Sequence, residues 1–160
     1  MTVPAVSSPY LPPGLPVPVS ESDGLAEPFW AGLRKGRLLV QRCTSCGTWQ
    51  FAPEWICHHC HTFDPGWVEV APAGCIYSWE RVWHPAHPAL SSHGPYLAIL
   101  VELPQAGGVR MVGNLLGDPD QQVVIGAAVT GVFEHHPQTD PPYTLLQWTL
   151  DVGVPPDAGS

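Results

Sequence analysis

The sequence predicts a mainly β protein with one N-terminal helix, a zinc ribbon and a small barrel of five to six strands. Two Cys-x-x-Cys pairs, at 43–46 and 57–60, predict the ribbon. The chain of 160 residues contains 20 Pro and 16 Gly, which favour turns over long helices. Beyond residue 66, apolar segments alternate with turn residues at roughly 8–12-residue spacing, as in sandwiches and barrels. Five to six strands in about 85 residues fit a closed barrel of the OB type.

The proline-rich segment 1–23 is expected to be extended, because proline is incompatible with a helix interior. Two interpretations stay open for it, a disordered tail and an arm that lies on a partner. A helix is expected next, over residues 24–36. Ser22 or Asp23 is expected to cap its start, with Pro28 in the first turn.

One face of this helix is apolar, and Gly36 is a plausible end to it. The ribbon is then expected over 37–66. Its strands are predicted at 37–42 and 48–51, the second of them ended by Ala52 and Pro53.

The barrel is expected over 67–150, followed by a C-terminal tail at 151–160. Its segments are rich in Val, Ile, Leu and aromatic residues, which favour strands. The predicted β-segments cover residues 67–70, 75–83, 95–103, 109–116, 123–125, 128–134 and 143–150, and five to six of them are expected to form the barrel.

The four paired cysteines, Cys43, Cys46, Cys57 and Cys60, are the expected ligands of one zinc ion. Each pair can place two thiolates on one tight turn, and two such turns supply a tetrahedral site. Four thiolates leave no open position for water or substrate. The metal is therefore expected to stabilise the fold and to take no part in chemistry.

The cysteines admit three other interpretations. Disulfides are disfavoured because no secretory signal follows Met1, and a reducing cytoplasm is the expected location. A thioredoxin-like redox motif needs a single pair in a βαβ context. Iron could occupy the same four sulfurs, although zinc is preferred. The fifth cysteine, Cys75, is expected to be a buried, inert thiol.

Charge restricts the partners of the chain. Only 12% of the residues are charged, and the net charge is −8 with six Lys plus Arg. A surface this acidic is a poor binder of nucleic-acid phosphates. No run approaches the roughly 18–20 apolar residues of a membrane span, so no membrane partner is expected.

A small basic cluster, Arg34, Lys35 and Arg37, could hold the phosphates of coenzyme A. It could equally stabilise the C-terminus of the predicted helix. A second group, His84, His87 and His93, could ligate a metal or move protons, but it lies on a loop without a nearby carboxylate. Surface or partner contacts are the plainer interpretation of that loop. Three further histidines, expected to lie at the surface, surround the second cysteine pair: His58, His59 and His61.

Aromatic residues near the cysteines are the main interface candidates. Trp49, Phe51 and Trp55 lie between the two pairs, where a ribbon has little core to bury them. Phe29 and Trp30 on the predicted helix are added to this group. No nucleophile motif, phosphate-binding loop or zinc-protease motif is present, so the chain is not expected to be an enzyme alone.

Several of these motifs together resemble the DUF35 family, a rubredoxin-like zinc ribbon joined to an acyl-CoA-associated OB-fold. The resemblance covers residues 24–150. It rests on these motifs: Phe29-Trp30-x-Gly32-Leu33-x-x-Gly36-x-Leu38, Gln41-Arg42-Cys43-x-x-Cys46-Gly47, Pro53, Cys57-x-x-Cys60, Trp67-Val68-Glu69-Val70, Gly74-x-Ile76-Tyr77-Ser78, Val101-Glu102-Leu103, Asn114-Leu115 and Ile125-Gly126-x-x-Val129.

The resemblance implies an accessory subunit of a thiolase-superfamily enzyme, a thiolase or a thiolase-like aldolase. The partner supplies the catalytic residues, acyl-CoA is contacted at the interface, and steroid or lipid side-chain degradation is one implied setting. Two copies around a partner dimer are expected. Two alternatives remain: a zinc-ribbon OB module that binds single-stranded nucleic acid, and a self-sufficient hydrolase or CoA enzyme that uses the histidine loop.

Overall fold

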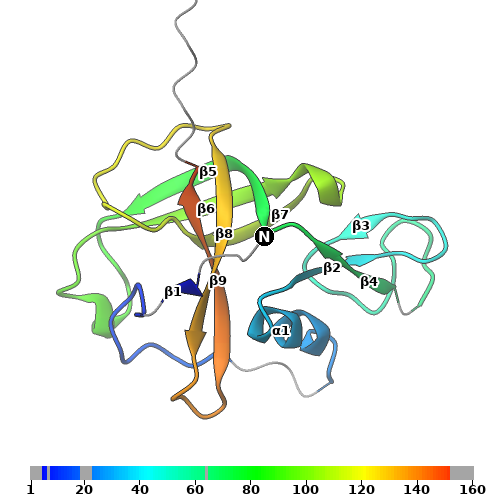
Figure 1. The fold of residues 1–160 in the computed structure, drawn as a ribbon, viewed down its shortest axis with the longest axis horizontal. Helices are drawn as coiled ribbons and strands as arrows, with labels where there is room; N and C mark the ends of the chain where they lie inside the picture. Colours follow the sequence, from blue (N-terminus) through cyan, green and yellow to red (C-terminus); the bar gives the residue numbers. More distant parts are fainter. Residues whose placement is uncertain (1–4, 7, 19–22, 64, 152–160) are drawn as a thin grey trace, which may run out of the picture.

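The computed structural model describes residues 5–6, 8–18, 23–63 and 65–151. Figure 1 shows a barrel, a smaller ribbon beside it and helix α1 (Glu27–Arg34) below the ribbon. The expected fold class is confirmed, a mainly β chain with one α-helix, a ribbon and a nearly closed five-stranded barrel. Among the described residues, no helix is long and apolar enough to cross a membrane.

Helix α1 spans Glu27–Arg34, which is shorter than the predicted range. The expected cap at Asp23 is wrong, because Ala26 occupies the N-cap position. Gly24, with a φ of 78°, turns the chain between Asp23 and the helix. The carboxylate of Asp23 instead accepts a hydrogen bond from the backbone N–H of Leu25 at 2.9 Å. The other proposed cap, Ser22, lies outside the described residues.

The end of α1 agrees with the sequence. The backbone N–H of Gly36 donates to the carbonyl of Leu33 at 3.0 Å, and Gly36 has a φ of 68°. Glycine adopts this left-handed conformation without a Cβ penalty, and helices commonly end this way. Leu33 is buried in the main core, which fixes the helix to the barrel and the ribbon.

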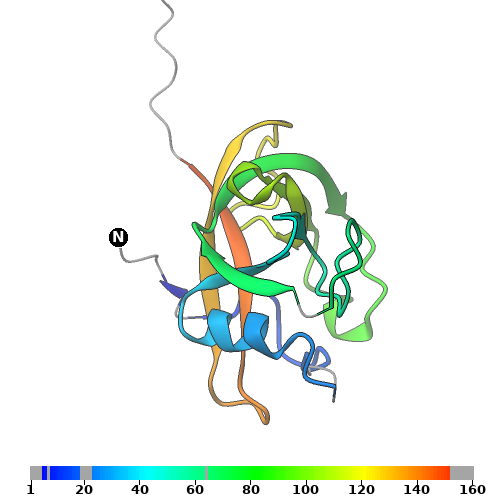
Figure 2. The same ribbon diagram turned by 90° about the vertical axis from the view of Figure 1, so that its right-hand side faces the viewer.

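Three antiparallel strands form the ribbon sheet, in the order β3-β2-β4. The central strand β2 spans Leu38–Arg42, β3 spans Trp49–Gln50 and β4 spans Gly66–Val70. Residues 67–70, expected in the barrel, lie in β4 and pair with β2 of the ribbon. In Figure 2 this small sheet lies on the side toward the viewer, in front of the barrel.

Strands β5 to β9 form the barrel. They span Ala73–Val82, Tyr96–Leu103, Val109–Asn114, Ala128–His136 and Tyr143–Leu150.

The barrel strands pair in the order β9-β8-β5-β6-β7, all antiparallel. A parallel bridge between Leu115 and Trp148 brings the chain just beyond β7 against β9 and nearly closes the barrel. Trp148 is buried at this seam, and a Cβ added to Gly113 would lie 2.7 Å from its indole ring. Two short 3₁₀ helices, η1 (Pro88–Leu90) and η2 (Pro104–Ala106), lie at either end of β6.

The prediction of a strand at 123–125 is wrong. Val123 is buried, as in a strand, but Val124 and Ile125 are both exposed. The segment runs into a turn at Gly126, whose φ of 89° interrupts extended backbone. Alternating apolar residues cannot distinguish a strand from a loop that inserts one side chain into the core.

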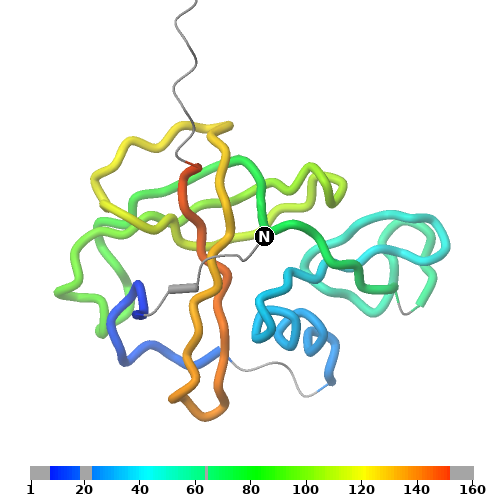
Figure 3. Tube along the Cα trace, viewed as in Figure 1, coloured from blue at the N-terminus to red at the C-terminus, as the bar shows by residue number. Residues whose placement is uncertain are grey.

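The N-terminal segment lies against the barrel, a placement that the sequence did not indicate. Strand β1, at Ala5–Val6, pairs in parallel with β8 at Phe133 and Glu134. Residues 8–18, named here the arm, then pass along the barrel surface, as the blue tube in Figure 3 shows. The arm thus contacts the chain's own barrel.

Candidate metal centre

Two turns of the same design carry the cysteines. In the first, the backbone N–H of Cys43 donates to the carbonyl of Thr48 at 2.8 Å, and that of Gly47 donates to the carbonyl of Cys43 at 2.9 Å. Gly47 has a φ of 75°, which an L-residue adopts only with strain. These bonds curl the chain so that both sulfurs of the pair face one side.

The second turn repeats this pattern. The backbone N–H of Cys57 donates to Thr62 and that of His61 donates to Cys57, both at 2.9 Å. His61 takes the position of the glycine, with a φ of 60°. Histidine is one of the few residues enriched in this region. His61 is therefore explained by backbone geometry, and its neighbours His58 and His59 are exposed, as expected.

All four sulfurs lie within 4.8 Å of one another. Sγ of Cys43 is 3.5 Å from Sγ of Cys60, and Sγ of Cys46 is 3.7 Å from Sγ of Cys57. A tetrahedron with Zn–S bonds of ~2.3 Å has edges of roughly 3.8 Å, whereas a disulfide is ~2.05 Å long. The residues fit one zinc ion, and with four thiolates the site is closed. The cysteines therefore form a site for a single structural zinc.

A threonine supports one sulfur of each turn. The hydroxyls of Thr48 and Thr62 lie 3.2 Å from Sγ of Cys46 and Cys60. Hydrogen bonding with the Thr48 hydroxyl and backbone lowers the pKa of Cys46 to about 5. The same two groups of Thr62 lower the pKa of Cys60. A hydroxyl that donates to a thiolate stabilises the charged form, which is the form that binds metal.

Two buried glutamines, which the sequence reasoning missed, hold the loop between the turns. Oε1 of Gln41 accepts hydrogen bonds from Nε2 of Gln50 at 3.0 Å and from the backbone N–H of Glu54 at 2.9 Å. Oε1 of Gln50 in turn accepts from the backbone N–H of His58 at 3.3 Å. Buried side-chain amides of this kind replace water for a loop that has little secondary structure. They fix the backbone on either side of Trp55.

The ribbon surface exposes large apolar side chains. Trp55 is 47% exposed, as the sequence suggested, and two unpredicted neighbours, Ile56 and Phe63, are 39% and 71% exposed. Ile56 and Phe63 face each other across an antiparallel bridge. These three residues are named the ribbon patch. Nothing in the sequence around Phe63 indicates that its ring lies on the surface.

The other four aromatic candidates pack between the ribbon and the barrel. Phe29 lies 5.4 Å from Trp30 and 5.5 Å from Phe51 between ring centroids. Trp49 packs against the core at its edge, with the guanidinium of Arg42 5.1 Å from its ring. All four are half-buried. Their contact with a partner stays a prediction.

Two of the three residues of the basic cluster form ion pairs with glutamates. Arg34 lies 2.6 Å from the carboxylate of Glu27, and Arg37 lies 2.6 Å from that of Glu69. Lys35 forms the C-cap of α1 and, in the part of the chain described, has no ion pair. The positive charge available for coenzyme A phosphates is therefore reduced, and this role stays a prediction.

The histidine loop does not form a metal site. Nδ1 of His87 accepts from the backbone N–H of Ala89 at 3.2 Å and so caps η1, while His84 and His93 are exposed. Across the described ranges, the four cysteines are the one group of three or more His, Cys, Asp or Glu residues at metal-ligating distances. Cys75 lies outside that group and is half-buried rather than buried.

The fold and the cysteine site define a zinc-ribbon protein with an OB-type barrel. Sequence profiles agree in both parts: the ChsH2 rubredoxin-like zinc ribbon domain matches residues 30–66, and the ChsH2 C-terminal OB-fold domain matches residues 67–134. The chain belongs to this ChsH2-type DUF35 family.

Two sequence relatives are informative. A probable enoyl-CoA hydratase alpha subunit of Thermomonospora curvata is 40% identical over 102 residues, which are 63% of this chain and 31% of the relative. This chain thus spans less than a third of that protein. A DUF35 domain-containing scaffold protein of Methanocaldococcus jannaschii is 28% identical over 115 residues, 69% of this chain and 78% of the relative.

Two solved structures share the fold. A chain described as the Ltp2-ChsH2(DUF35) aldolase matches with a TM-score of 0.70 and 33% identity, over 84% of this chain and 98% of that chain. A DUF35 protein of unknown function from Sulfolobus solfataricus matches with a TM-score of 0.53 and 19% identity, over 79% and 85%. The second match supports the fold alone.

Proposed function

We propose that this chain is a non-catalytic scaffold subunit that docks on a thiolase-like aldolase or thiolase and supports its acyl-CoA chemistry. The observation that carries the proposal is the likeness to a ChsH2 chain of an aldolase over 98% of that chain. The closed zinc site fits it, because a four-thiolate site stabilises structure without offering a position for substrate. Steroid or lipid side-chain degradation is the setting that we infer.

The ribbon patch is the proposed centre of the docking surface. Exposed aromatic residues on a rigid scaffold are typical of interface anchors, and Trp is enriched among them. The zinc site and the two buried glutamines hold Trp55 before any partner arrives. Pre-ordering of this kind lowers the entropy lost on binding.

A cleft next to the ribbon is a second candidate contact for the partner. It has a volume of about 440 Å³ and lies between α1, the inter-cysteine loop and the barrel, with Phe29, Phe51 and Met111 among its lining residues. We propose that it receives an apolar side chain of the partner. Contact with acyl-CoA, and two copies of the chain around a partner dimer, belong to the same proposal.

Co-expression with a thiolase-like subunit tests the proposal. We expect the two chains to co-purify, and the partner's turnover of its acyl-CoA substrate to fall when this chain is omitted. The purified chain alone should turn over no acyl-CoA. A partner that is fully active, stable and unassociated by itself would contradict the proposal.

The ribbon patch has a matched test. The double substitution Trp55→Ala and Phe63→Ala should weaken partner binding roughly tenfold or more, because anchors of this type carry most of the binding energy. Val124→Ala, at an exposed apolar position on the barrel loop, is the control and should leave the affinity unchanged. If the double variant binds the partner as tightly as the Val124→Ala control does, the ribbon patch is not the docking centre.

A further inference from the structure

Three polar side chains are buried together beneath the arm, away from the zinc site. Glu134, His136 and Gln147 are 2%, 7% and 2% exposed. Glu134 and His136 lie on β8, and Gln147 lies on the neighbouring strand β9. Buried ionisable groups cost free energy unless they are bonded, so such a group calls for an explanation.

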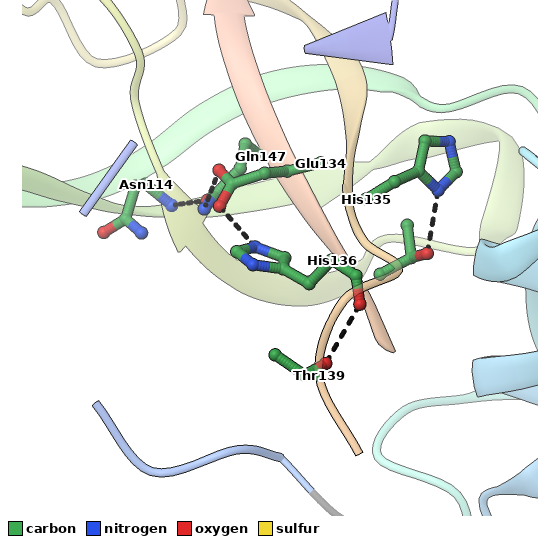
Figure 4. A network of polar contacts seen from close by, with 7 residues as sticks. Asn114, Glu134, His135, His136, Thr139 and Gln147 are labelled. Atoms are coloured by element: carbon green, nitrogen blue, oxygen red, sulfur yellow. Dashed lines mark hydrogen bonds and ion pairs between the residues drawn. The ribbon is translucent and has the colours of Figure 1, made fainter. Parts of the chain in front are cut away.

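The three side chains form one chain of hydrogen bonds (Figure 4). Nε2 of His136 lies 2.7 Å from one carboxylate oxygen of Glu134, and Nε2 of Gln147 donates to the other at 3.0 Å. Oε1 of Gln147 accepts from the backbone N–H of Asn114 at 3.0 Å. Both carboxylate oxygens and the Gln147 amide are thus used inside the protein.

The imidazole of His136 is held in one orientation. The ring of Tyr143 stacks on it, with centroids 4.2 Å apart and an interplanar angle of 10°. Burial, followed by the charge of Glu134, raises the pKa of Tyr143, so its phenol stays neutral. Nδ1 of His136 has no hydrogen-bond partner among the described residues. In that part of the chain, the one side-chain nitrogen or oxygen that is both fully buried and without a partner is Nε1 of Trp148. Nδ1 of His136 is therefore not fully buried and can be reached by a ligand.

A cavity of about 460 Å³ adjoins this imidazole. One wall is the arm, with Leu11, Leu15 and Val17 among its residues, and the other wall includes His136 and Leu145. Pockets for small ligands usually have 300–1,000 Å³ and an apolar lining with a few polar groups. The cavity has both properties.

We propose that the space between the arm and strands β8 and β9 binds a neutral, mainly apolar molecule through one hydroxyl group. The hydroxyl would hydrogen-bond to Nδ1 of His136, and the apolar body would lie against Leu11, Leu15 and Leu145. A hydroxyl suits this nitrogen because it can donate to the bare nitrogen and accept from the protonated one. The inference does not depend on the proposed partner enzyme.

The charges around the cavity disfavour anionic and cationic ligands. A carboxylate would be placed near Glu134 in a protein whose net charge is −8. An ammonium would lose its hydration among aliphatic side chains, and both oxygens of Glu134 are already bonded. A neutral hydroxyl avoids both costs.

Three naphthalene probes test the proposal on the full chain. We expect calorimetry to show saturable one-to-one binding of 2-naphthol. Displacement should show 2-methylnaphthalene, in which a methyl replaces the hydroxyl, to be roughly three- to tenfold weaker, the usual effect of one neutral hydrogen bond. The anion 2-naphthoate should not compete at the same concentrations.

Substitutions in and outside the cavity test where 2-naphthol binds. Leu15→Trp places a larger side chain in the cavity from the arm, leaves the three buried polar residues themselves unchanged and should abolish 2-naphthol binding. Ile125→Trp, on the exposed barrel loop, should not change it. His136→Phe keeps a ring against Tyr143 and should remove the preference for 2-naphthol over 2-methylnaphthalene.

Several results would overturn the proposal. They are the absence of saturable 2-naphthol binding, equal affinities for 2-naphthol and 2-methylnaphthalene, and undiminished binding by Leu15→Trp. If His136→Phe does not fold, the comparison of Leu15→Trp with Ile125→Trp still decides whether the cavity is the site. No partner enzyme is present in these measurements, so they are independent of the co-purification test.

Discussion

Gly47 and His61 occupy equivalent places in the two cysteine turns, and both have positive φ. Gly47→Ala should cost roughly 1–2 kcal/mol, because an L-residue is strained there. The space itself is open, since an added Cβ would approach nothing closer than 3.7 Å. His61→Gly should be close to neutral, as relief of strain offsets the greater entropy of glycine. Zinc retention against a chelator measures both, and a Gly47→Ala chain as resistant as wild type would contradict the explanation.

Thr48 sets the acid limit of the site. Its hydroxyl and backbone hold the pKa of Cys46 at about 5, below the ordinary 9.0. A depressed pKa favours the folded, metal-binding form at high pH, and this advantage is lost as the pH falls through about 5. Thr48→Val raises this pKa, so zinc should be released at a higher pH than from wild type. A colorimetric zinc indicator follows the release as the pH is lowered. Equal pH midpoints for wild type and Thr48→Val would refute this explanation.

The sequence could predict the metal ligands at this scale, but not their supports. Spacing alone identifies four thiolates, because Cys-x-x-Cys is dictated by the geometry of one turn. The threonine that follows each pair by two residues is visible in the sequence, yet its hydroxyl contact depends on how the turn closes. Phe63 was missed because nothing in its neighbours shows that it lies on the surface.

At the scale of elements, the buried glutamines are expected to hold the loop that carries Trp55. Gln50→Leu removes the acceptor of the His58 N–H and leaves backbone groups unpaired, which costs about 1–3 kcal/mol locally. Amide hydrogen exchange at residues 54–58 should therefore speed up while zinc stays bound. Gln122→Leu, at an exposed position, is the control. Unchanged exchange in Gln50→Leu would show that the loop is held by the metal alone.

The contact between ribbon and barrel depends on a glycine. Gly107 has a φ of 65°, and a Cβ there would lie 2.7 Å from Cδ1 of Trp49. Gly108 has a φ of 77°, but its added Cβ would approach nothing closer than 4.0 Å. Gly107→Ala should thus destabilise the protein by at least ~1 kcal/mol more than Gly108→Ala. Thermal unfolding measures the difference, and equal losses would mean that Trp49 gives way without cost.

Most strands could be predicted, because a run of β-branched and aromatic residues favours extended backbone whichever strand it pairs with. The neighbouring strand with which each of them pairs was less predictable. Segment 67–70 reads as a strand in either sheet, and only its register with β2 places it in the ribbon. Segment 123–125 has the pattern of a strand, but Gly126 turns the chain before pairing can form.

At the scale of the whole molecule, the barrel and ribbon could be predicted and the path of the arm could not. Proline excludes helix from residues 8–18 but leaves open what the extended chain contacts. The buried polar chain under the arm was equally hidden, because Glu134, His136 and Gln147 are far apart in sequence or lie among strand residues. Pairing of β8 with β9 alone brings them together.

The central claim is that zinc holds the ribbon as a docking surface beside an independently stable barrel. Partner binding by Cys57→Ser, measured by light scattering on mixtures with the thiolase-like subunit, tests it most directly. With three ligands left, the chain should lose zinc and partner binding, while the barrel retains its amide protection. Cys75→Ser, outside the site, should bind as wild type does. Undiminished binding by Cys57→Ser would contradict the claim.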